Sequence, residues 1–266
     1  MSKPDIVKLT KADGILEVLF DRPPVNAIDA DTSRRLGQVF AAFRDDPALR
    51  VAIVTASGDK IFSAGWDLKA ASAMGPAETA ALDIGPGGFA GLTRMFDLNK
   101  PVIAAVNGRA IGGGVELALA CDLIVMAEGA DFSLPEAARG VVADAGGLQR
   151  LPRRLPYHVA MDLLLTGRRM YAAEALHYGL ANAVVPRAQL MDKAREIARV
   201  IAEGAPLSIE ATKEVIRETE HLSVQQTFAV TQARSLPAHA RLYASEDLKE
   251  GPRAFAEKRK PNWKGR

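Results

Sequence analysis

Two glutamates and two glycine-rich segments are the parts of this sequence that could carry out chemistry together. Glu116 follows three consecutive glycines, Gly112–Gly114, and Glu136 follows Pro135 in a later segment. Each carboxylate taken singly has an ordinary structural explanation, because acidic residues stabilise the first turn of a helix and proline often opens that turn. As a pair, two carboxylates can act as general acid and general base on one substrate.

The glycine-rich segments are KIFSAGWDLKA (60–70) and NGRAIGGGVELALA (107–120), and each follows a predicted strand. Glycine lets backbone N–H groups approach a ligand, although tight loops need the same residues. The second segment lacks the G-x-G-x-x-G spacing and a following Lys-Ser or Lys-Thr pair, so we do not expect a nucleotide phosphate site. Two such loops can each direct one N–H at a developing oxyanion. With two carboxylates they suit proton transfer beside a thioester carbonyl, where the enolate oxygen must be stabilised as it forms.

Other potentially reactive residues have structural explanations. Asp144 precedes Ala-Gly-Gly, a turn-like setting in which it could cap the next helix. Cys121 lies in the apolar run LALACDLIVM, which favours a buried small side chain over a nucleophile. The histidines show no metal-ligand spacing, and we expect no metal site; they are His158, His177, His221 and His239.

The elements that must position these residues begin with a hairpin, because IVKL and ILEVLF flank Asp13-Gly14. Asp29 and Asp31 are candidate N-caps for a helix through residues 33–46. Three apolar runs indicate buried strands, and a helix is predicted after the glycine triplet, between the last two of them. Strands that alternate with helices predict an α/β fold. The three runs are VAIVTAS (51–57), PVIAAVNG (101–108) and DLIVMAE (122–128).

The second half of the chain is predicted to be mainly helical from about Tyr157 onward. Gly167, Gly179 and Gly204 are candidate C-caps of these helices.

Composition narrows the class of partner. The net charge of +2 argues against nucleic acid, although a few clustered cations could still hold a phosphorylated small molecule. The single cysteine rules out a disulfide within the chain and suits a reducing compartment. The first eleven residues have no apolar core of signal-peptide length, and no apolar run approaches the roughly 20 residues of a membrane span. We expect a cytoplasmic protein with no membrane partner.

Four motifs, in their order and spacing, resemble the enoyl-CoA hydratase/isomerase (crotonase) superfamily from about Leu16 to the end of the chain. They are FSAGWDLK, NGRAIGGGVELALACD, FSLPEAARGVVADAGGLQRLP and FAEKRKPNWKGR. The resemblance implies a crotonase-like spiral of ββα units over residues 1–200, which holds the coenzyme A and active sites, and a C-terminal helical trimerisation region over residues 201–266. The chains would assemble as homotrimers that commonly pair into hexamers. It also implies an acyl-CoA thioester substrate, with coenzyme A as part of that substrate and no other cofactor.

The resemblance also assigns site residues. The backbone N–H groups of Trp66 and Gly113 would form the oxyanion hole, and Glu116 and Glu136 match the two catalytic glutamates of hydratases. Further residues would bind the coenzyme A portion. Lys69 would lie near its phosphates, Val25, Ala27 and Ala64 would shape the adenine and pantetheine pocket, and Phe255 and Lys258 would reach the coenzyme A of a neighbouring subunit.

Within the superfamily the chain looks most similar to the carnitinyl-CoA dehydratases, which implies reversible loss of water from carnitinyl-CoA to give crotonobetainyl-CoA. DRPPVNAIDA, GPGGFAGLT, LTGRRM and SEDLKEGPRAFAEKR carry this likeness. Hydratases typically have Pro-Gly where this chain has Ala143-Asp144, so Asp144 adds a third carboxylate that could contact the substrate. Carnitinyl-CoA dehydratases tend to share that Asp.

Three alternatives stay open at this stage. The first is a general enoyl-CoA hydratase of fatty-acid or amino-acid breakdown. The second is a dienoyl- or enoyl-CoA double-bond isomerase, in which Glu136 and Asp144 would shuttle a proton and no water would be added. Dienoyl-CoA isomerases share the Asp at position 144. They typically have Asp at the position of Glu116, which argues against this alternative. The third is a catalytically silent member that only binds coenzyme A, against which the presence of both glutamates argues.

Overall fold

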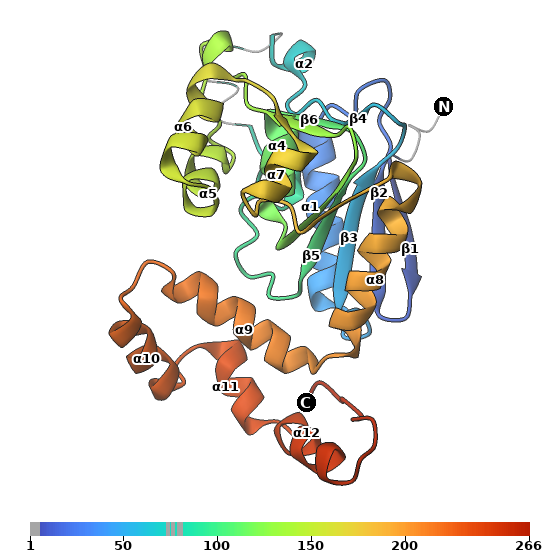
Figure 1. The fold of residues 1–266 in the computed structure, drawn as a ribbon, viewed down its shortest axis with the longest axis vertical. Coiled ribbons are helices and arrows are strands. Elements are labelled where there is room, and N and C mark those ends of the chain that lie inside the picture. Colours follow the sequence, from blue (N-terminus) through green and yellow to red (C-terminus); the bar gives the residue numbers. More distant parts are fainter. Residues whose placement is uncertain (1–5, 73–74, 76–77, 79–81) are drawn as a thin grey trace.

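A six-stranded sheet forms the centre of the computed structural model, which describes residues 6–72, 75, 78 and 82–266 (Figure 1). Its order is β1-β2-β3-β5-β7-β10, and every neighbouring pair except β1 and β2 is parallel. Strands β3 and β5 are buried at every position, as their continuous apolar sequences predicted. The strands are β1 (Val7–Ala12), β2 (Ile15–Phe20), β3 (Val51–Ala56), β5 (Val102–Val106), β7 (Leu123–Ala127) and β10 (Ala183–Val185).

A second, smaller sheet has the order β4-β6-β8-β9. Its strands are β4 (Ile61–Ser63), β6 (Arg109–Ile111), β8 (Asp131–Ser133) and β9 (Met170–Tyr171). After each of β3, β5 and β7 the chain adds one strand to this sheet and then turns into a helix. This repetition is the spiral of ββα units that the motifs implied, so the predicted α/β class is confirmed.

Helix α1 (Ala30–Asp45) begins where the sequence predicted a cap, because the Asp29 side chain accepts a hydrogen bond from the Thr32 N–H. Helix α8 (Leu190–Glu203) packs against β2, β3, β5 and β7 and covers one face of the large sheet. Other short helices connect the strands: α2 (Leu68–Ser72), α4 (Gly113–Ala120), α5 (Gly147–Arg154), α6 (Tyr157–Thr166), α7 (Ala172–His177), and the 3-10 turns η1 (Phe89–Gly91), η2 (Ala137–Arg139) and η3 (Arg187–Gln189).

The last four helices lie below the large sheet in Figure 1, at the end opposite to α2. They are α9 (Pro206–Thr219), α10 (Val224–Ala233), α11 (Pro237–Ala244) and α12 (Asp247–Ala256). The ammonium of Lys213 on α9 donates to the Lys100 carbonyl at 3.0 Å and to the Asp122 carboxylate at 2.7 Å. The Trp263 indole N–H donates to the Glu203 carbonyl at 2.9 Å, which ties the C-terminal tail to the end of α8. The chain's final segment is thus fixed against the core.

Two of the predicted caps are confirmed and two differ. Gly167 ends α6 in the left-handed conformation with φ of 65°, and Gly179 follows the last turn of α7 in the same conformation with φ of 73°. Asp144 does not cap α5, because Gly146 occupies the N-cap position and no side chain caps that helix. Gly204 ends α8 with extended backbone.

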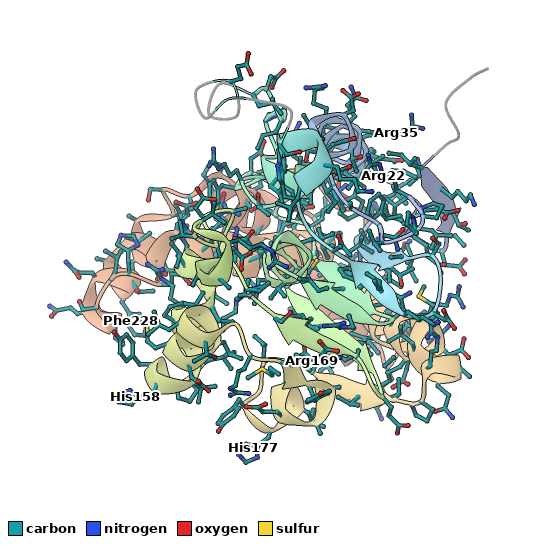
Figure 2. All side chains as sticks on the ribbon, turned by 90° about the horizontal axis from the view of Figure 1, so that it is seen from above. Arg22, Arg35, His158, Arg169, His177 and Phe228 are labelled. Atoms are coloured by element: carbon teal, nitrogen blue, oxygen red, sulfur yellow. The ribbon has the colours of Figure 1, made fainter. Side chains whose placement is uncertain are left out.

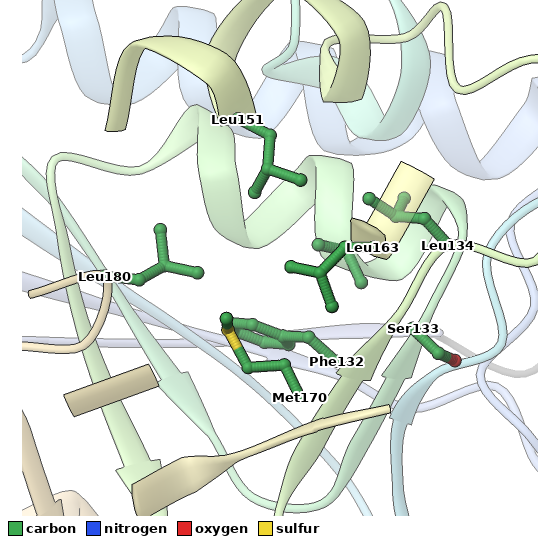
Figure 3. A pocket seen from close by; sticks show the side chains of 8 residues that line it. Phe132, Ser133, Leu134, Leu151, Leu163, Met170 and Leu180 are labelled. Carbon is green, nitrogen blue, oxygen red and sulfur yellow. The ribbon is translucent and has the colours of Figure 1, made fainter. Parts of the chain in front are cut away.

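A small apolar cavity of about 10 Å³ lies between α4, α5, α6 and β8 (Figure 3). Its lining is almost entirely aliphatic or aromatic, and that volume holds about one water molecule at most. The lining residues are Val115, Phe132, Ser133, Leu134, Leu151, Leu163, Met170 and Leu180. The cavity is therefore a packing void behind the site and is too small for a substrate. None of the helices in the described ranges has the length and apolarity needed to cross a membrane.

Candidate active site

Two loops meet where the sequence predicted an oxyanion hole. The first follows β4 and contains Gly65 and Trp66, and the second joins β6 to α4 at Gly113. A Cβ atom on Gly65 would lie 2.6 Å from the Gly113 nitrogen, so the two backbones are in direct contact. Gly65 has φ of 77° and Gly112 has φ of 54°, values that favour glycine.

The amides of these loops are available to a ligand. Ile28 forms a parallel bridge with Trp66, in which the Ile28 N–H donates to the Gly65 carbonyl and the Asp67 N–H donates to the Ile28 carbonyl. The Trp66 N–H faces away from this bridge. Gly113 is the first residue of α4, where amides have no acceptor within the helix. Within the described ranges neither N–H donates to a protein group.

Glu116 lies in the first turn of α4 and is 4% exposed. Its Oε1 accepts a hydrogen bond from the Gly147 N–H at 2.9 Å. Burial is the main influence and raises the pKa of Glu116 to about 7, the Gly147 amide opposes that rise, and the negative charges of Glu136 and Asp144 add to it. A carboxyl group with this pKa exchanges protons readily at neutral pH.

Glu136 precedes η2 and points at the second loop. A Cβ atom on Gly112 would lie 2.7 Å from Glu136 Oε1, which places this carboxylate directly beside the oxyanion hole. Its Oε2 is buried and has no hydrogen-bond partner among the described residues. Burial raises the pKa of Glu136, its own backbone N–H and Arg139 oppose the rise, and Asp144 adds to it. The unpartnered oxygen is available to accept a substrate proton.

Asp144 is exposed on the segment between η2 and α5. Its negative charge acts on both Glu116 and Glu136, so the structure brings the third carboxylate close to the other two, as the sequence suggested. The site therefore gathers two free amides and three carboxylates, which is the arrangement needed to stabilise an enolate and to move protons on adjacent carbons.

Two contributions were not predicted. Phe89 in η1 lies against Gly113, since a Cβ on that glycine would come within 2.5 Å of the ring, and it pairs with Trp66 at a centroid distance of 5.8 Å. The glycine-rich run GPGGFAGLT that holds Phe89 was a usable signal, but nothing in the sequence showed which loop it would contact. The Gly147 amide is the second, and it lies 31 residues beyond its acceptor Glu116.

The residues assigned to the coenzyme A pocket fall into two groups. Val25 and Ala64 are joined directly, because the Ala64 N–H donates to the Val25 carbonyl at 2.9 Å, and Ala27 lies on the same segment. Lys69 is exposed on α2, just after the loop of Trp66. Val25 and Ala64 thus meet at the start of the loop that holds Trp66, and Lys69 follows that loop. Their roles in binding stay predictions.

Phe255 and Lys258 do not join the site of their own chain. Phe255 lies in the last turn of α12 and Lys258 just beyond it, in the group of helices that Figure 1 shows at the opposite end of the molecule from α2. Phe255 is 87% exposed, which leaves its ring available to another molecule. Contact with the coenzyme A of a neighbouring subunit stays a prediction.

The remaining reactive side chains lie outside the site. Cys121 is buried, and burial raises the pKa of its thiol well above the usual range, so the nucleophile reading has no support. Figure 2 shows His158 and His177 at the outer edge of the molecule, on the side opposite to Arg22. Among the described residues no cluster of three or more metal-ligand side chains is present.

Comparisons with known proteins agree with this geometry. A family model described as enoyl-CoA hydratase/isomerase matches residues 10–266. The carnitinyl-CoA dehydratases of Proteus mirabilis (strain HI4320) and Escherichia coli O157:H7 are each 56% identical over 258 residues, which cover 97% of this chain and 98% of each relative.

Solved structures give the same result. The enoyl-CoA hydratase from Mycobacterium tuberculosis H37Rv superposes with a TM-score of 0.88 at 40% identity and covers 98% of this chain and 99% of that chain. The enoyl-CoA hydratase from Bacillus anthracis superposes with a TM-score of 0.90 at 33% identity, with coverage of 98% and 100%. This chain therefore belongs to the enoyl-CoA hydratase/isomerase family.

Proposed function

We propose that the protein is a hydro-lyase that reversibly removes water from carnitinyl-CoA to give crotonobetainyl-CoA. The observation that carries the reaction type is the pair of unpartnered amides at Trp66 and Gly113, with the Glu136 carboxylate beside them and Glu116 buried on the same helix turn. The 56% identity to carnitinyl-CoA dehydratases over nearly the whole chain supports the choice of substrate.

The two amides bind the thioester oxygen. When a base removes the α-proton, charge develops on that oxygen, and the N–H groups of Trp66 and Gly113 stabilise it. They are fixed by the backbone contact at Gly65, so they need no reorganisation during the reaction. Loss of one such donor costs about 3 kcal/mol of transition-state stabilisation.

The two glutamates transfer the protons. In dehydration, ionised Glu136 takes the α-proton, and the electron pair of that C–H bond moves into the enolate. The enolate then re-forms the thioester carbonyl as the Cα=Cβ double bond forms and the bond to the β-hydroxyl breaks. Protonated Glu116 gives its proton to the departing oxygen, which leaves as water. Hydration is the reverse, with syn addition and the opposite protonation states.

These protonation states fix the direction of the pH dependence. Both directions need the glutamate pair to hold one proton, and the overall reaction releases none, so kcat/KM must have the same pH dependence in the two directions. Because burial and neighbouring charges raise the pKa of Glu116 to about 7, the pair loses this proton above neutral pH, and both directions should slow there. Both should also slow in acid, where the second carboxylate becomes protonated, and these limbs belong to the coupled glutamates as a pair. Measurement of kcat/KM in both directions from pH 5 to pH 9 tests this, and a flat profile above pH 7 would contradict it.

Asp144 is our candidate for recognition of the trimethylammonium group. It is exposed close to both glutamates, and a carboxylate can balance a quaternary ammonium charge. The paired rings of Trp66 and Phe89 offer an aromatic face for the same group. Asp144→Gly and Asp144→Asn should lower kcat/KM for carnitinyl-CoA more than for 3-hydroxybutyryl-CoA. An unchanged preference would refute the role of Asp144.

An ultraviolet assay at the enoyl-thioester band, run with a panel of coenzyme A esters, tests the function directly. The proposal predicts faster turnover of crotonobetainyl-CoA than of crotonyl-CoA, and a general enoyl-CoA hydratase predicts the reverse. Oxygen-18 from solvent should enter the hydrated product, which a double-bond isomerase would not show. Glu116→Gln and Glu136→Gln should each abolish turnover, and wild-type rates in the double variant would show that the assigned residues are wrong.

We also propose that the working unit is a cytoplasmic homotrimer, alone or as a pair of trimers, with coenzyme A bound only as part of the substrate. Family membership and the exposed position of Phe255 on α12 support a contribution from a neighbouring subunit. Light scattering should give a mass of three or six chains of 28.4 kDa. Phe255→Ala and Lys258→Ala should raise KM for the thioester with little change in kcat. Turnover that persists after chelator treatment would support the absence of a metal.

A further inference from the structure

One cation in the interior of the site region takes no part in the reaction proposed above. Arg150 lies on α5, one turn after the glycine pair that opens the helix, and its side chain is half-buried. Among the described residues it has no carboxylate within ion-pair distance, and its Nη2 instead donates to the carbonyl of Thr93 at 2.7 Å. A half-buried cation without a negatively charged partner is costly, so its position requires an explanation.

The guanidinium contacts both loops that shape the site. On one side it lies against Gly146, where a Cβ atom would come within 2.2 Å of Arg150 Nη1, and the next residue is Gly147, whose amide holds Glu116. On the other side Thr93 ends the glycine-rich run that places Phe89 against Gly113. Arg150 thus joins the turn behind the proposed acid to the loop behind the oxyanion hole.

The charged groups that act on Glu116 from the active-site loops are both negative. Glu136 faces it from the segment after β8, and Asp144 faces it from the segment before α5. Arg139 acts on Glu136. Burial lowers the pKa of Arg150, Arg154 lowers it further, and Cys121, Glu116 and Glu220 oppose the change, so Glu116 is one of three acidic groups that act on this cation.

We propose that Arg150 is a positioning residue that fixes the Gly146–Gly147 turn behind Glu116 and supplies the positive charge that offsets the site carboxylates. The proposal rests on the proposed function, because it assumes that Glu116 exchanges a proton with substrate. Removal of the charge makes ionisation of Glu116 less favourable. The contacts of Arg150 with Thr93 and Gly146 act as a clamp, and loss of this clamp loosens the Gly147 amide that holds the Glu116 carboxylate. Both effects favour the protonated acid.

Three variants separate the effect of the positive charge of Arg150 from the effect of its contacts with Thr93 and Gly146. Arg150→Gln is neutral but can still donate to Thr93, and Arg150→Lys keeps the charge without the two-armed contact. Arg153→Met removes a cation from the exposed side of the same helix and is the matched control. In Arg150→Gln the alkaline limb of kcat/KM should move to higher pH by about half a pKa unit, equally in dehydration and hydration. At pH 9, kcat/KM relative to its value at the optimum should then rise about threefold.

The controls make the proposal refutable. Arg150→Lys should keep the wild-type limbs of the pH profile but lower kcat about threefold. A threefold loss fits a small displacement of the Glu116 carboxylate, because a misplacement of about 1 Å can cost about 10²-fold in rate. Arg153→Met should keep both limbs and kcat. If Arg150→Gln does not fold, Arg150→Lys decides the question, because wild-type limbs together with wild-type kcat in that variant would exclude the clamp. Shifted limbs in Arg153→Met would show that any cation on the helix acts equally.

A second readout does not depend on turnover. Infrared titration of the buried carboxyl band, with Glu116→Gln as the subtraction reference, follows protonation of Glu116 directly. Arg150→Gln should shift this titration to higher pH, and an unshifted titration would overturn the proposal. If the titration shifts but Glu116→Gln retains turnover, then Arg150 acts on Glu116 as inferred and the proposed catalytic role of Glu116 is wrong.

Discussion

Glu116→Gln should make the folded protein more stable at pH 8 while it abolishes turnover. The folded state holds the proton of Glu116 more tightly than the unfolded chain does, because burial raises its pKa from 4.5 to about 7. Between these values the folded state binds more protons, so the free energy of unfolding falls as pH rises. The stabilising effect of the bound proton is complete below pH 4.5 and lost above about pH 7.

The magnitude follows from the size of the pKa change. A rise from 4.5 to about 7 corresponds to about 3 kcal/mol of destabilisation in the wild-type protein at pH 8. Glu116 is only 4% exposed, so solvent screening reduces this figure little. Glutamine has no ionisation to lose, and its oxygen can still accept the Gly147 N–H. The new NH₂ group of the glutamine would be buried without a hydrogen-bond acceptor, which costs about 1 kcal/mol. The net gain in the free energy of unfolding at pH 8 is then about 2 kcal/mol.

Urea unfolding at one protein concentration measures the effect, because the stability of an assembled protein depends on concentration. The free energy of unfolding of Glu116→Gln should exceed that of wild type at pH 8 and equal or fall below it at pH 5. Glu128→Gln, at an exposed position, is the matched control and should change neither value. A gain of the same size at both pH values would refute the reasoning, because it would not arise from ionisation.

Three further predictions concern single contacts. Gly65→Ala should lower kcat about 10²-fold with an unchanged circular dichroism spectrum, because its Cβ would lie 2.6 Å from the Gly113 nitrogen and displace an oxyanion donor. Asp131→Asn should lower the free energy of unfolding by about 2 kcal/mol in a urea titration, because Asp131 is fully buried and pairs with Arg169, whose side chain is 41% exposed. Trp263→Phe should cost about 1 kcal/mol in the same assay through loss of its indole hydrogen bond, with kcat unchanged.

The large sheet and its first helix were predictable because their signals are local. The hairpin turn at Asp13-Gly14 has positive φ at both residues, as that residue pair favours. The cap at Asp29 needs only a hydrogen bond to a residue three positions on. Runs of apolar β-branched residues likewise gave β3 and β5. Each of these features depends on neighbours in the sequence.

The small sheet was not predictable from the residues alone. Its strands contain two or three residues each, too few for an alternating pattern, and they exist because neighbouring ββα units align them. The prediction that Asp144 caps α5 was wrong for a similar reason. Gly146 takes the N-cap position with φ of 133°, and Asp144 lies too early to reach the helix amides. Tertiary contacts decided both features.

The candidate site was predictable as a set of residues but not as a geometry. The motifs named Glu116, Glu136 and the two glycine loops, and the structure brings them together. The contacts that tune them join distant segments. Gly147 reaches Glu116 across 31 residues, and Arg150 reaches Thr93 across 57. No periodicity or cap in the sequence encodes contacts of this range.

The donors that we propose for the oxyanion hole belong to the main chain, and this has a consequence for how the protein can diverge. An alanine scan would pass over them, since every residue except proline carries the same N–H. The side chain at position 66 can therefore be exchanged to fit a different acyl group while the electrophilic catalysis persists. Selection for a new substrate can thus replace Trp66 while the main-chain amides continue to stabilise the enolate oxygen.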